Sequence, residues 1–435
     1  MNILIVAVGS AGDVYPFIAI GQELKRRGHD VKLFAAAPFQ SKVENAGLAF
    51  HSGFSQTHFD ALVAETELWH PRKGLPIMLK SLGAQTRAGY ALLLEHIRAD
   101  DTVLVGSSLA FPARLLQESH GVKLATVHLA PACFFSASDP ALHGDMAWLR
   151  ALPAWAVRAV FNLLERTLID PLVGAQLAPV RAELGLAPVR HIMGRWLHSP
   201  QRVICAWPAW FAAPKADWPA NAVCTGFPRL AAAPGQALGD ALQRFLDAGP
   251  APLAATPGSA MAHGRLFFQR AIGAAAALGL RVVLVTPYRE QLPEVLPPFA
   301  HYEAYVPFDL LAPRVAAFIH HGGIGTCANA LAAGKPQLIA PFAYDQPDNA
   351  ARLRRLGVAA SVAPRAPLET WTRALAGLLN QPGTPAACRA IAARMAREPC
   401  AAAHIADLIE ELGNAAHHAT PPARDTTKGA SAHAS

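Results

Sequence analysis

Charged residues and cysteines are scarce in this 435-residue chain. Only 16% of the residues are charged, and the six cysteines stand far apart with no C-x-x-C pair. Such spacing favours neither a zinc site nor a disulfide framework, so reduced thiols are the expected state. Lys and Arg outnumber Asp and Glu, giving a net charge of +7, but they are scattered without an aromatic-interleaved basic stripe. This argues against nucleic acid and for an anionic substrate or an anionic membrane surface.

Long apolar runs are also absent. The Ala-rich run from Ala271 to Leu280 ends at Arg281, well short of the ~18 residues that a spanning helix needs. The chain begins with the strand-like I-L-I-V-A-V and has no basic region followed by a cleavage site, so no signal peptide is expected. We expect a cytoplasmic protein, either soluble or in peripheral contact with the inner membrane.

Two successive arrays of alternating apolar strands and helical segments fill the chain. Its length and its 52% hydrophobic content allow two or three sizeable cores. Continuous apolar runs between helical segments are typical of strands buried in a parallel sheet. The predicted strands are 3–8, 31–35, 48–51, 102–105, 123–129 and 203–206, then 252–256, 281–286, 301–305, 315–319, 337–339 and 358–362.

These arrays predict an α/β protein with two Rossmann-like, doubly wound domains. The first domain is expected over 1–212 and the second over 238–398, joined by a proline-rich linker at 213–237. A helix at 399–412 is expected to cross back to the first domain, and 413–435 is expected to be a disordered tail. The stretches 53–73 and 131–145 are expected to be irregular.

A helical segment is expected over 146–168. Trp148, Trp155 and Leu163 recur on it at helical spacing, and Arg158 and Arg166 lie eight residues apart on its polar face. Two interpretations stay open. The segment is either an ordinary amphipathic helix packed over a cleft, or a helix that lies on a membrane surface.

The most informative motif lies between residues 315 and 349. A predicted strand ends in H-H-G-G-I-G-T, a helix follows, and the next strand leads to Asp345 and Gln346. Glycines let the backbone take left-handed conformations and approach a ligand, and the exposed N–H groups of a helix N-terminus attract an anion. His321 adds an imidazole N–H. Together these groups suit a sugar attached to a diphosphate, although a plain turn with a satisfied histidine pair is the alternative.

H-H-G-G-I-G-T followed by D-Q resembles the signature of nucleotide-sugar-dependent glycosyltransferases of the two-Rossmann (GT-B) type, family 1. The resemblance implies two domains that face each other across a cleft, with a nucleotide-sugar as co-substrate and no other cofactor. It also implies that the following residues bind the donor: the pyrophosphate by His321, Gly323, Gly325 and Thr326, the sugar hydroxyls by Asp345 and Gln346, and the nucleobase by the Tyr305 ring and the Val306 backbone.

Two further features concern the leaving group. Ser259, in the turn T-P-G-S-A, is either a second phosphate-side donor or part of a plain turn. No D-x-D pair occurs in the chain, so we expect no metal site, and the diphosphate would be neutralised by backbone N–H groups and His321.

Asp13 is the predicted general base. From local sequence alone, a helix N-cap is the favoured role for an aspartate in G-S-A-G-D-V-Y-P. That motif, however, resembles the first-strand motif of bacterial family 1 transferases, whose aspartate is the proposed base. Removal of a proton from the acceptor hydroxyl on the side opposite the leaving group would invert the anomeric configuration. Ser10, Gly12 and His128 are expected on the acceptor side.

A narrower resemblance extends from the N-terminus to about residue 412. The stretch 197–227 is similar to the interdomain region of the rhamnosyltransferases of rhamnolipid biosynthesis. It implies transfer of L-rhamnose from dTDP-L-rhamnose to a 3-(3-hydroxyalkanoyloxy)alkanoic acid, and a partner subunit that synthesises this acyl acceptor. Two alternatives stay open: a family 1 enzyme for another apolar aglycone, polyketide- or sterol-like, and a non-catalytic accessory subunit that binds sugar nucleotides. Pro257 departs from the pattern of relatives and leaves the geometry of its turn open.

Overall fold

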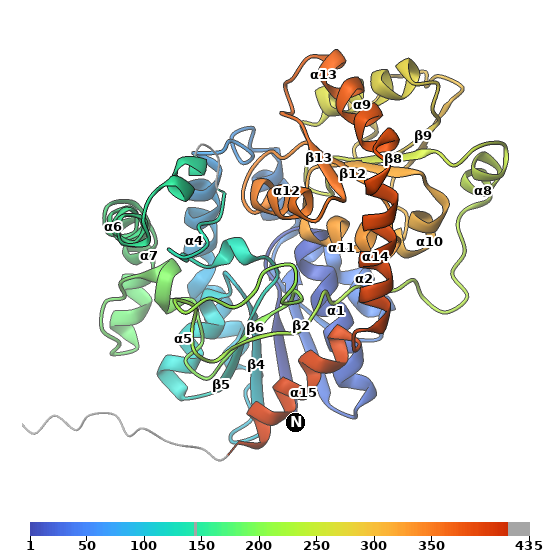
Figure 1. Ribbon diagram of the computed structural model, residues 1–435. Coiled ribbons are helices and arrows are strands. Elements are labelled where there is room, and N and C mark those ends of the chain that lie inside the picture. The colour runs from blue at the N-terminus through green and yellow to red at the C-terminus, as the bar shows by residue number, and fades with distance from the viewer. Residues whose placement is uncertain (143–145, 416–435) are drawn as a thin grey trace, which may run out of the picture.

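Each half of the chain forms one parallel β-sheet. The computed structural model describes residues 1–142 and 146–415 (Figure 1). The first sheet has the strand order β3-β2-β1-β4-β5-β6-β7, and the second has the order β10-β9-β8-β11-β12-β13. In both sheets the order reverses beside the first strand, at β1/β4 and at β8/β11, as in Rossmann folds. The predicted α/β class with two Rossmann-like domains is therefore confirmed.

The strands follow the apolar runs closely. β1, β4 and β5 are buried at every position, because helices cover both faces of a parallel sheet. The strands are β1 (Asn2–Val6), β2 (Asp30–Ala36), β3 (Ala49–Phe54), β4 (Thr102–Ser107), β5 (Lys123–His128), β6 (Arg202–Cys205), β7 (Ala222–Cys224), β8 (Leu253–Thr256), β9 (Val282–Val285), β10 (Ala300–Glu303), β11 (Ala317–His320), β12 (Gln337–Ile339) and β13 (Ala359–Ser361).

The helices of the first half are α1 (Ala11–Arg26), α2 (Gln40–Asn45), α3 (Gln56–Ala64), α4 (Gly74–Leu94), α5 (Phe111–His120), α6 (Ala154–Leu164) and α7 (Asp170–Glu183). Those of the second half are α8 (Asp240–Asp247), α9 (Arg265–Ala277), α10 (Phe308–Leu311), α11 (Ile324–Ala332), α12 (Gln346–Arg355), α13 (Leu368–Asn380), α14 (Gly383–Arg397) and α15 (Ala401–Asn414).

Three local expectations differ from the structure. The stretch 53–73 is not wholly irregular, because α3 lies within it. The predicted linker 213–237 includes β7, which pairs with β6 in the first sheet. The helical segment 146–168 consists of a 3-10 helix, η3 (Met146–Ala151), then α6, then a π-helical turn, η4 (Glu165–Ile169). Pro153 separates the first two, since it lacks the N–H that a continuous helix needs. The predicted tail lies outside the described residues from 416 onward.

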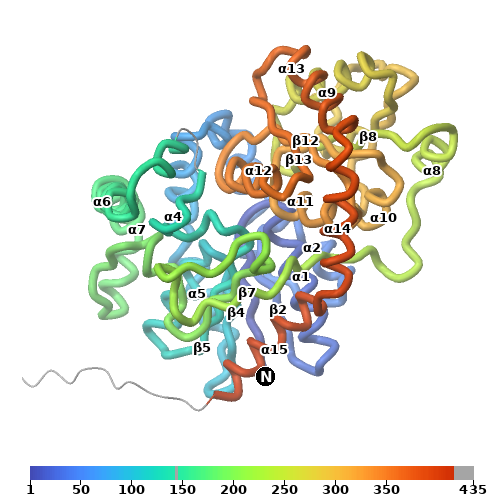
Figure 2. Tube along the Cα trace, viewed as in Figure 1, coloured from blue at the N-terminus to red at the C-terminus, as the bar shows by residue number. Residues whose placement is uncertain are grey.

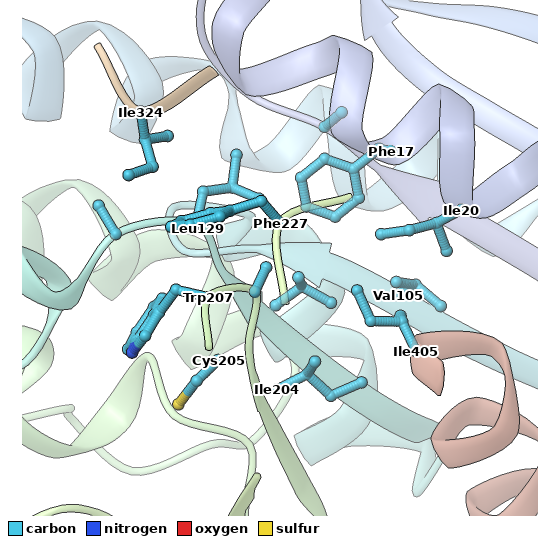
Figure 3. Close-up of a cluster of buried hydrophobic side chains, with 14 of the residues drawn as sticks. Phe17, Ile20, Val105, Leu129, Ile204, Cys205, Trp207, Phe227, Ile324 and Ile405 are labelled. Atoms are coloured by element: carbon cyan, nitrogen blue, oxygen red, sulfur yellow. The ribbon is translucent and has the colours of Figure 1, made fainter. Parts of the chain in front are cut away.

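The C-terminal helix α15 returns to the first domain. Its buried residues include Ile405 and Ile409, which join the core around Val105 and Ile20 (Figure 3). Arg27, the C-cap residue of α1, donates to Asp407 at 2.6 Å and to Glu410 at 2.7 Å. Figure 2 shows the chain running from α14, in the second domain, down to α15 beside the first.

Charged side chains also connect the two domains. Asp348 of α12 is fully buried and accepts hydrogen bonds from Arg150 of η3 at 2.9 Å and from Arg352 at 2.6 Å. Arg352 also pairs with Asp139 of the first domain at 3.0 Å. A charge buried among paired partners is strongly position-specific, so this cluster fixes α12 against the first domain. Within the described residues, no helix combines the length and apolarity needed to cross a membrane.

Candidate active site

In each sheet the strand order reverses beside the first strand, and the turns at these two places open into one cavity of about 770 Å³. They follow β1, β4, β8 and β11, at the carboxyl ends of the strands where ligands bind in open α/β sheets. Residues from both domains line the cavity. They include every site residue predicted from the sequence: Ser10, Gly12, Asp13, His128, Ser259, Tyr305, Val306, His321, Gly323, Gly325, Thr326, Asp345 and Gln346.

Asp13 folds back onto the turn that precedes it. Ser10, not Asp13, is the N-cap residue of α1. Oδ2 of Asp13 accepts hydrogen bonds from the Ser10 backbone N–H at 2.8 Å and from the Ser10 hydroxyl at 3.0 Å. Burial raises the pKa of Asp13, and these two hydrogen bonds oppose that rise. Within the described residues nothing donates to Oδ1, so this oxygen is available to a ligand.

The two histidines after β11 have different environments. His320 is fully buried, with its Nδ1 accepting from the Gly322 N–H at 3.1 Å and its Nε2 bonded to Gln337 at 3.0 Å. It therefore holds the turn in shape. His321 faces the cavity, and its buried Nδ1 lacks a hydrogen-bond partner in the described structure. Burial lowers the pKa of His321 to about 4, so its imidazole is neutral at pH 7 and has one nitrogen left for a ligand.

The three glycines of this turn have different functions. Only Gly322 has a positive φ, of 94°. A Cβ on Gly323 would lie 2.3 Å from Nε2 of His321, so this position must be glycine for the ring to lie where it does. Gly325 has an ordinary backbone, and a Cβ added there would lie 3.6 Å from the Gly12 Cα across the domain boundary. The expectation of left-handed backbone is thus right for Gly322 and wrong for the other two.

Asp345 and Gln346 lie at the start of α12, beside the histidine turn. Asn349 connects them to it, because its NH₂ group donates to Asp345 Oδ2 at 2.7 Å and to the Gly322 carbonyl at 3.0 Å. Gln346 lines the cavity and also stabilises the turn before α12, because its side-chain oxygen accepts hydrogen bonds from the N–H groups of Phe342 and Ala343. Its NH₂ group is the part left for a ligand. Asn349 escaped the sequence analysis, although it lies one helical turn after Asp345.

The two carboxylates in the cavity influence each other. Burial raises the pKa of Asp345, and the negative charge of Asp13 raises it further; together they bring it to about 7. Two carboxylates in one poorly solvated site cannot both ionise easily. The cavity therefore favours cationic or hydrogen-bond-donating groups near this pair.

The turn after β8 contacts both domains. Gly258 has a φ of 100°, and a Cβ there would lie 2.9 Å from Nε2 of His321. The Ser259 hydroxyl accepts from the Ala11 N–H, in the first domain, at 3.3 Å. The Ser259 hydroxyl is therefore the partner of the first N–H of α1 in this structure, and its role towards a phosphate stays a prediction.

Tyr305 lies half exposed at the cavity and is held by the first domain. Its hydroxyl accepts from Lys42 at 3.0 Å, and its ring meets the Tyr15 ring edge-to-face at 6.4 Å. Val306 is buried in the core of the second domain. Base stacking on Tyr305 stays a prediction, and Lys42 is a neighbour that the sequence did not indicate.

His128 contributes to the cavity wall as part of a closed network. Its Nδ1 bonds to the Ser108 hydroxyl at 2.8 Å and its Nε2 to His198 at 2.9 Å. Burial and the neighbouring His198 lower the pKa of His128 well below its ordinary value. With both nitrogens engaged, His128 orients Ser108 and is not free to act on an acceptor hydroxyl.

Most of the cavity wall is apolar and comes from the first domain. Tyr344, which has a φ of 59°, closes it by donating its hydroxyl to the Leu68 carbonyl at 2.6 Å. The apolar side chains come from α3, α4 and the segment 146–172, and include Phe59, Leu62, Leu75, Met78, Leu79, Leu82, Phe161, Leu164, Leu168 and Leu172. Within 1–142 and 146–415, no group of three or more His, Cys, Asp or Glu side chains is placed to hold a metal ion.

Comparison with protein families gives one match in each domain. Residues 3–128 match the glycosyltransferase family 28 N-terminal domain. Residues 269–412 match the C-terminal domain described as erythromycin biosynthesis protein CIII-like. The two matches fall on the first and second Rossmann-like domains.

Similar proteins extend over nearly the whole chain. O-mycaminosyltylonolide 6-deoxyallosyltransferase of Streptomyces fradiae is 29% identical over 84% of this chain and 86% of its own. Among solved structures, the glycotransferase of kitacinnamycin has a TM-score of 0.69 at 22% identity, covering 94% of this chain and 98% of its own. A spinosyn rhamnosyltransferase complexed with thymidine diphosphate has a TM-score of 0.66 at 20% identity, covering 94% and 100%.

Proposed function

Since this chain is a glycosyltransferase of the GT-B, family 1 type, we propose that it transfers a sugar from a nucleoside diphosphate to the hydroxyl of a long apolar acceptor. In its narrowest form, the proposal is L-rhamnose from dTDP-L-rhamnose to a 3-(3-hydroxyalkanoyloxy)alkanoic acid. One observation carries it: most of the wall of the cavity that contains Asp13 and His321 consists of apolar side chains of the first domain.

In this mechanism Oδ1 of Asp13 takes the proton of the acceptor hydroxyl. The hydroxyl oxygen then forms a bond to the anomeric carbon while the bond from that carbon to the diphosphate oxygen breaks, with inversion of configuration. The diphosphate leaves with the electron pair. The N-terminus of α11, the Thr326 hydroxyl and Nδ1 of His321 stabilise its charge, and no metal ion takes part.

The donor sugar would lie between the histidine turn after β11 and the Asp345–Gln346 pair at the start of α12. Asp345 and the NH₂ group of Gln346 face the cavity beside the histidine turn, and both suit sugar hydroxyls. Because Asn349 holds the Asp345 carboxylate, the sugar hydroxyls would donate hydrogen bonds to a carboxylate whose position is fixed. The Tyr305 ring is proposed to stack on the nucleobase, and Ser259 to turn from Ala11 towards the phosphate.

A second candidate acceptor is a polyketide-like aglycone. The names of the similar proteins, which include a tylonolide and a spinosyn transferase, favour this class. A chain-like acyl acceptor fits the many Leu and Met side chains along α4 and η4, whereas a rigid macrocycle would need a wide mouth. The cytoplasmic location and the acyl-synthesising partner subunit stay predictions.

The test is an incubation of the purified chain with dTDP-L-rhamnose and, in parallel, a 3-(3-hydroxyalkanoyloxy)alkanoate or a macrolide aglycone, with product mass measured. Rhamnosylated lipid supports the first acceptor class, and glycosylated macrolide supports the second. Tight dTDP binding without turnover on either acceptor, or on a panel of apolar alcohols, would indicate the accessory-subunit alternative.

A further inference from the structure

Exposed large apolar side chains gather on one short segment of the first domain. In the described residues nine such side chains are exposed, and five of them lie between 148 and 168: Trp148, Leu152, Trp155, Leu163 and Leu168. Trp155 is 74% exposed and Leu163 is 62% exposed. We name these five residues the 148–168 patch. Exposed apolar side chains that gather in one part of a domain indicate an interaction site.

The exposure does not come from a poorly packed helix. Val157 and Phe161, on the opposite side of α6, are buried with Leu149 and Ala137 in their own apolar cluster. The segment thus satisfies its core contacts with one face and presents a second apolar face outward. Figure 1 shows α6 and α7 at the outer flank of the first domain, on the opposite side of the view from α8. The two interpretations from the sequence, an amphipathic helix packed over a cleft and a helix that lies on a membrane surface, are therefore compatible with each other.

The charges beside the patch are of one sign. Arg158 and Arg166 are exposed. The acidic groups of the segment are engaged inward: Glu165 is buried and bonded to the Gly194 N–H at 2.7 Å, and Asp170 accepts from the N–H groups of His191 and Ile192. An outward face of tryptophan, leucine and arginine complements a negatively charged, partly apolar surface.

The patch is continuous with the acceptor cavity. Trp148 and Leu168 are exposed and also line the cavity, while Leu164 and Leu172 line it beside them. A water-soluble acceptor would gain nothing from an apolar rim. An acceptor dissolved in a bilayer could move along such a rim without crossing water.

We propose that the 148–168 patch docks this enzyme on a bilayer containing anionic phospholipids. Trp155 and Leu163 enter the boundary between headgroups and acyl chains, and Arg158 and Arg166 pair with lipid phosphates. The docking itself is independent of the proposed acceptor. The consequence that the acceptor enters the cavity from the bilayer rests on the proposed function.

The test is flotation of the full chain with vesicles of phosphatidylcholine alone or mixed with phosphatidylglycerol. The wild type binds the mixed vesicles, more weakly at high salt. The double variant Trp155→Glu/Leu163→Glu loses roughly tenfold or more of the vesicle partition coefficient. Arg158→Gln/Arg166→Gln loses about fivefold for each arginine on anionic vesicles and little on neutral ones.

Val295→Glu/Leu266→Glu is the matched control, because it introduces the same charges at exposed apolar positions of the second domain and should float like the wild type. Circular dichroism melting verifies that every variant is folded. Equal flotation of the two Glu double variants overturns the proposal, and so does a wild type that does not float. A wild type that captures a protein partner and does not float with vesicles would show that the patch binds protein and not lipid, which also overturns the proposal. Turnover of a short soluble acceptor by Trp155→Glu/Leu163→Glu should match the wild type, so failure of the proposed function would appear there and not in flotation.

Discussion

The glycine turn after β1 and the glycine turn after β11 use the same backbone plan for opposite chemistry. Each follows a central strand and opens a helix, and the two meet where Gly12 lies beside Gly325. The first turn carries Asp13, an acidic group held by Ser10. The second carries His321, a neutral group with an unpartnered nitrogen. The comparison teaches that the fold supplies two helix N-termini and that one side chain on each gives it its chemical character; under the proposed function, Asp13 accepts a proton and His321 receives an anion.

Asp13→Asn tests the first turn and should have the largest effect. The amide cannot take a proton, so kcat should fall by about 10²- to 10⁴-fold, while dTDP affinity stays within about twofold. Steady-state kinetics and calorimetric titration with dTDP measure the two quantities. A variant that keeps most of its rate would show that the base is another group.

His321→Ala tests the second turn. Loss of a hydrogen bond to a charged group costs ~1.5–3 kcal/mol, so dTDP should bind roughly ten- to a hundredfold more weakly, with a lower kcat. His301→Ala is the control, since His301 is in the same domain and bonded to Glu303. Unchanged dTDP binding in His321→Ala would remove the phosphate role.

Gly323→Ala should reproduce part of the His321 effect without touching the imidazole itself. The added Cβ would fall 2.3 Å from the ring, and the histidine must move. We expect about tenfold weaker dTDP binding, given a displaced hydrogen bond to a charged group. Gly377→Ala, on the open surface of α13, is the matched control and should stabilise the protein by about 0.5–1 kcal/mol. Equal dTDP affinity in the two variants would contradict the packing argument.

Asp345→Asn should give the smallest effect, a change in pH dependence. Burial and the negative charge of Asp13 raise the pKa of Asp345 to about 7, so Asp345 is the carboxylate of this pair that titrates near neutral pH, and an amide in its place does not titrate. The limb of the kcat/KM profile near pH 7 should therefore disappear, whatever happens to its height. A limb that stays in place would show that it belongs to another group.

The same substitution has a thermal signature. The folded-state pKa of Asp345 is raised from 3.8 to about 7, so its contribution to stability is present at low pH and lost as the pH rises through about 7. Asp345→Asn should therefore gain in melting temperature relative to the wild type as the pH rises from about 4 to about 7.

Sequence reasoning succeeded where a short local pattern determines the structure. Apolar runs located the strands, and glycine turns located the cavity, because a parallel sheet brings the ends of its central strands together. It failed where the answer depends on distant residues. The structural position of His320 depends on its hydrogen bond to Gln337, and the position of the His321 ring depends on the space left by Gly258. The engagement of His128 depends on Ser108 and His198, which lie far from it in the sequence.

The return of α15 to the first domain has a practical consequence for chimeric enzymes. Ile405 and Ile409 complete a core that includes residues of β1, β2, β4, β5 and β6 in the first sheet. A hybrid in which everything after the linker is replaced would also exchange this piece of the first domain. A crossover that keeps 401–414 with its native partner should yield soluble hybrids where a single cut yields aggregates.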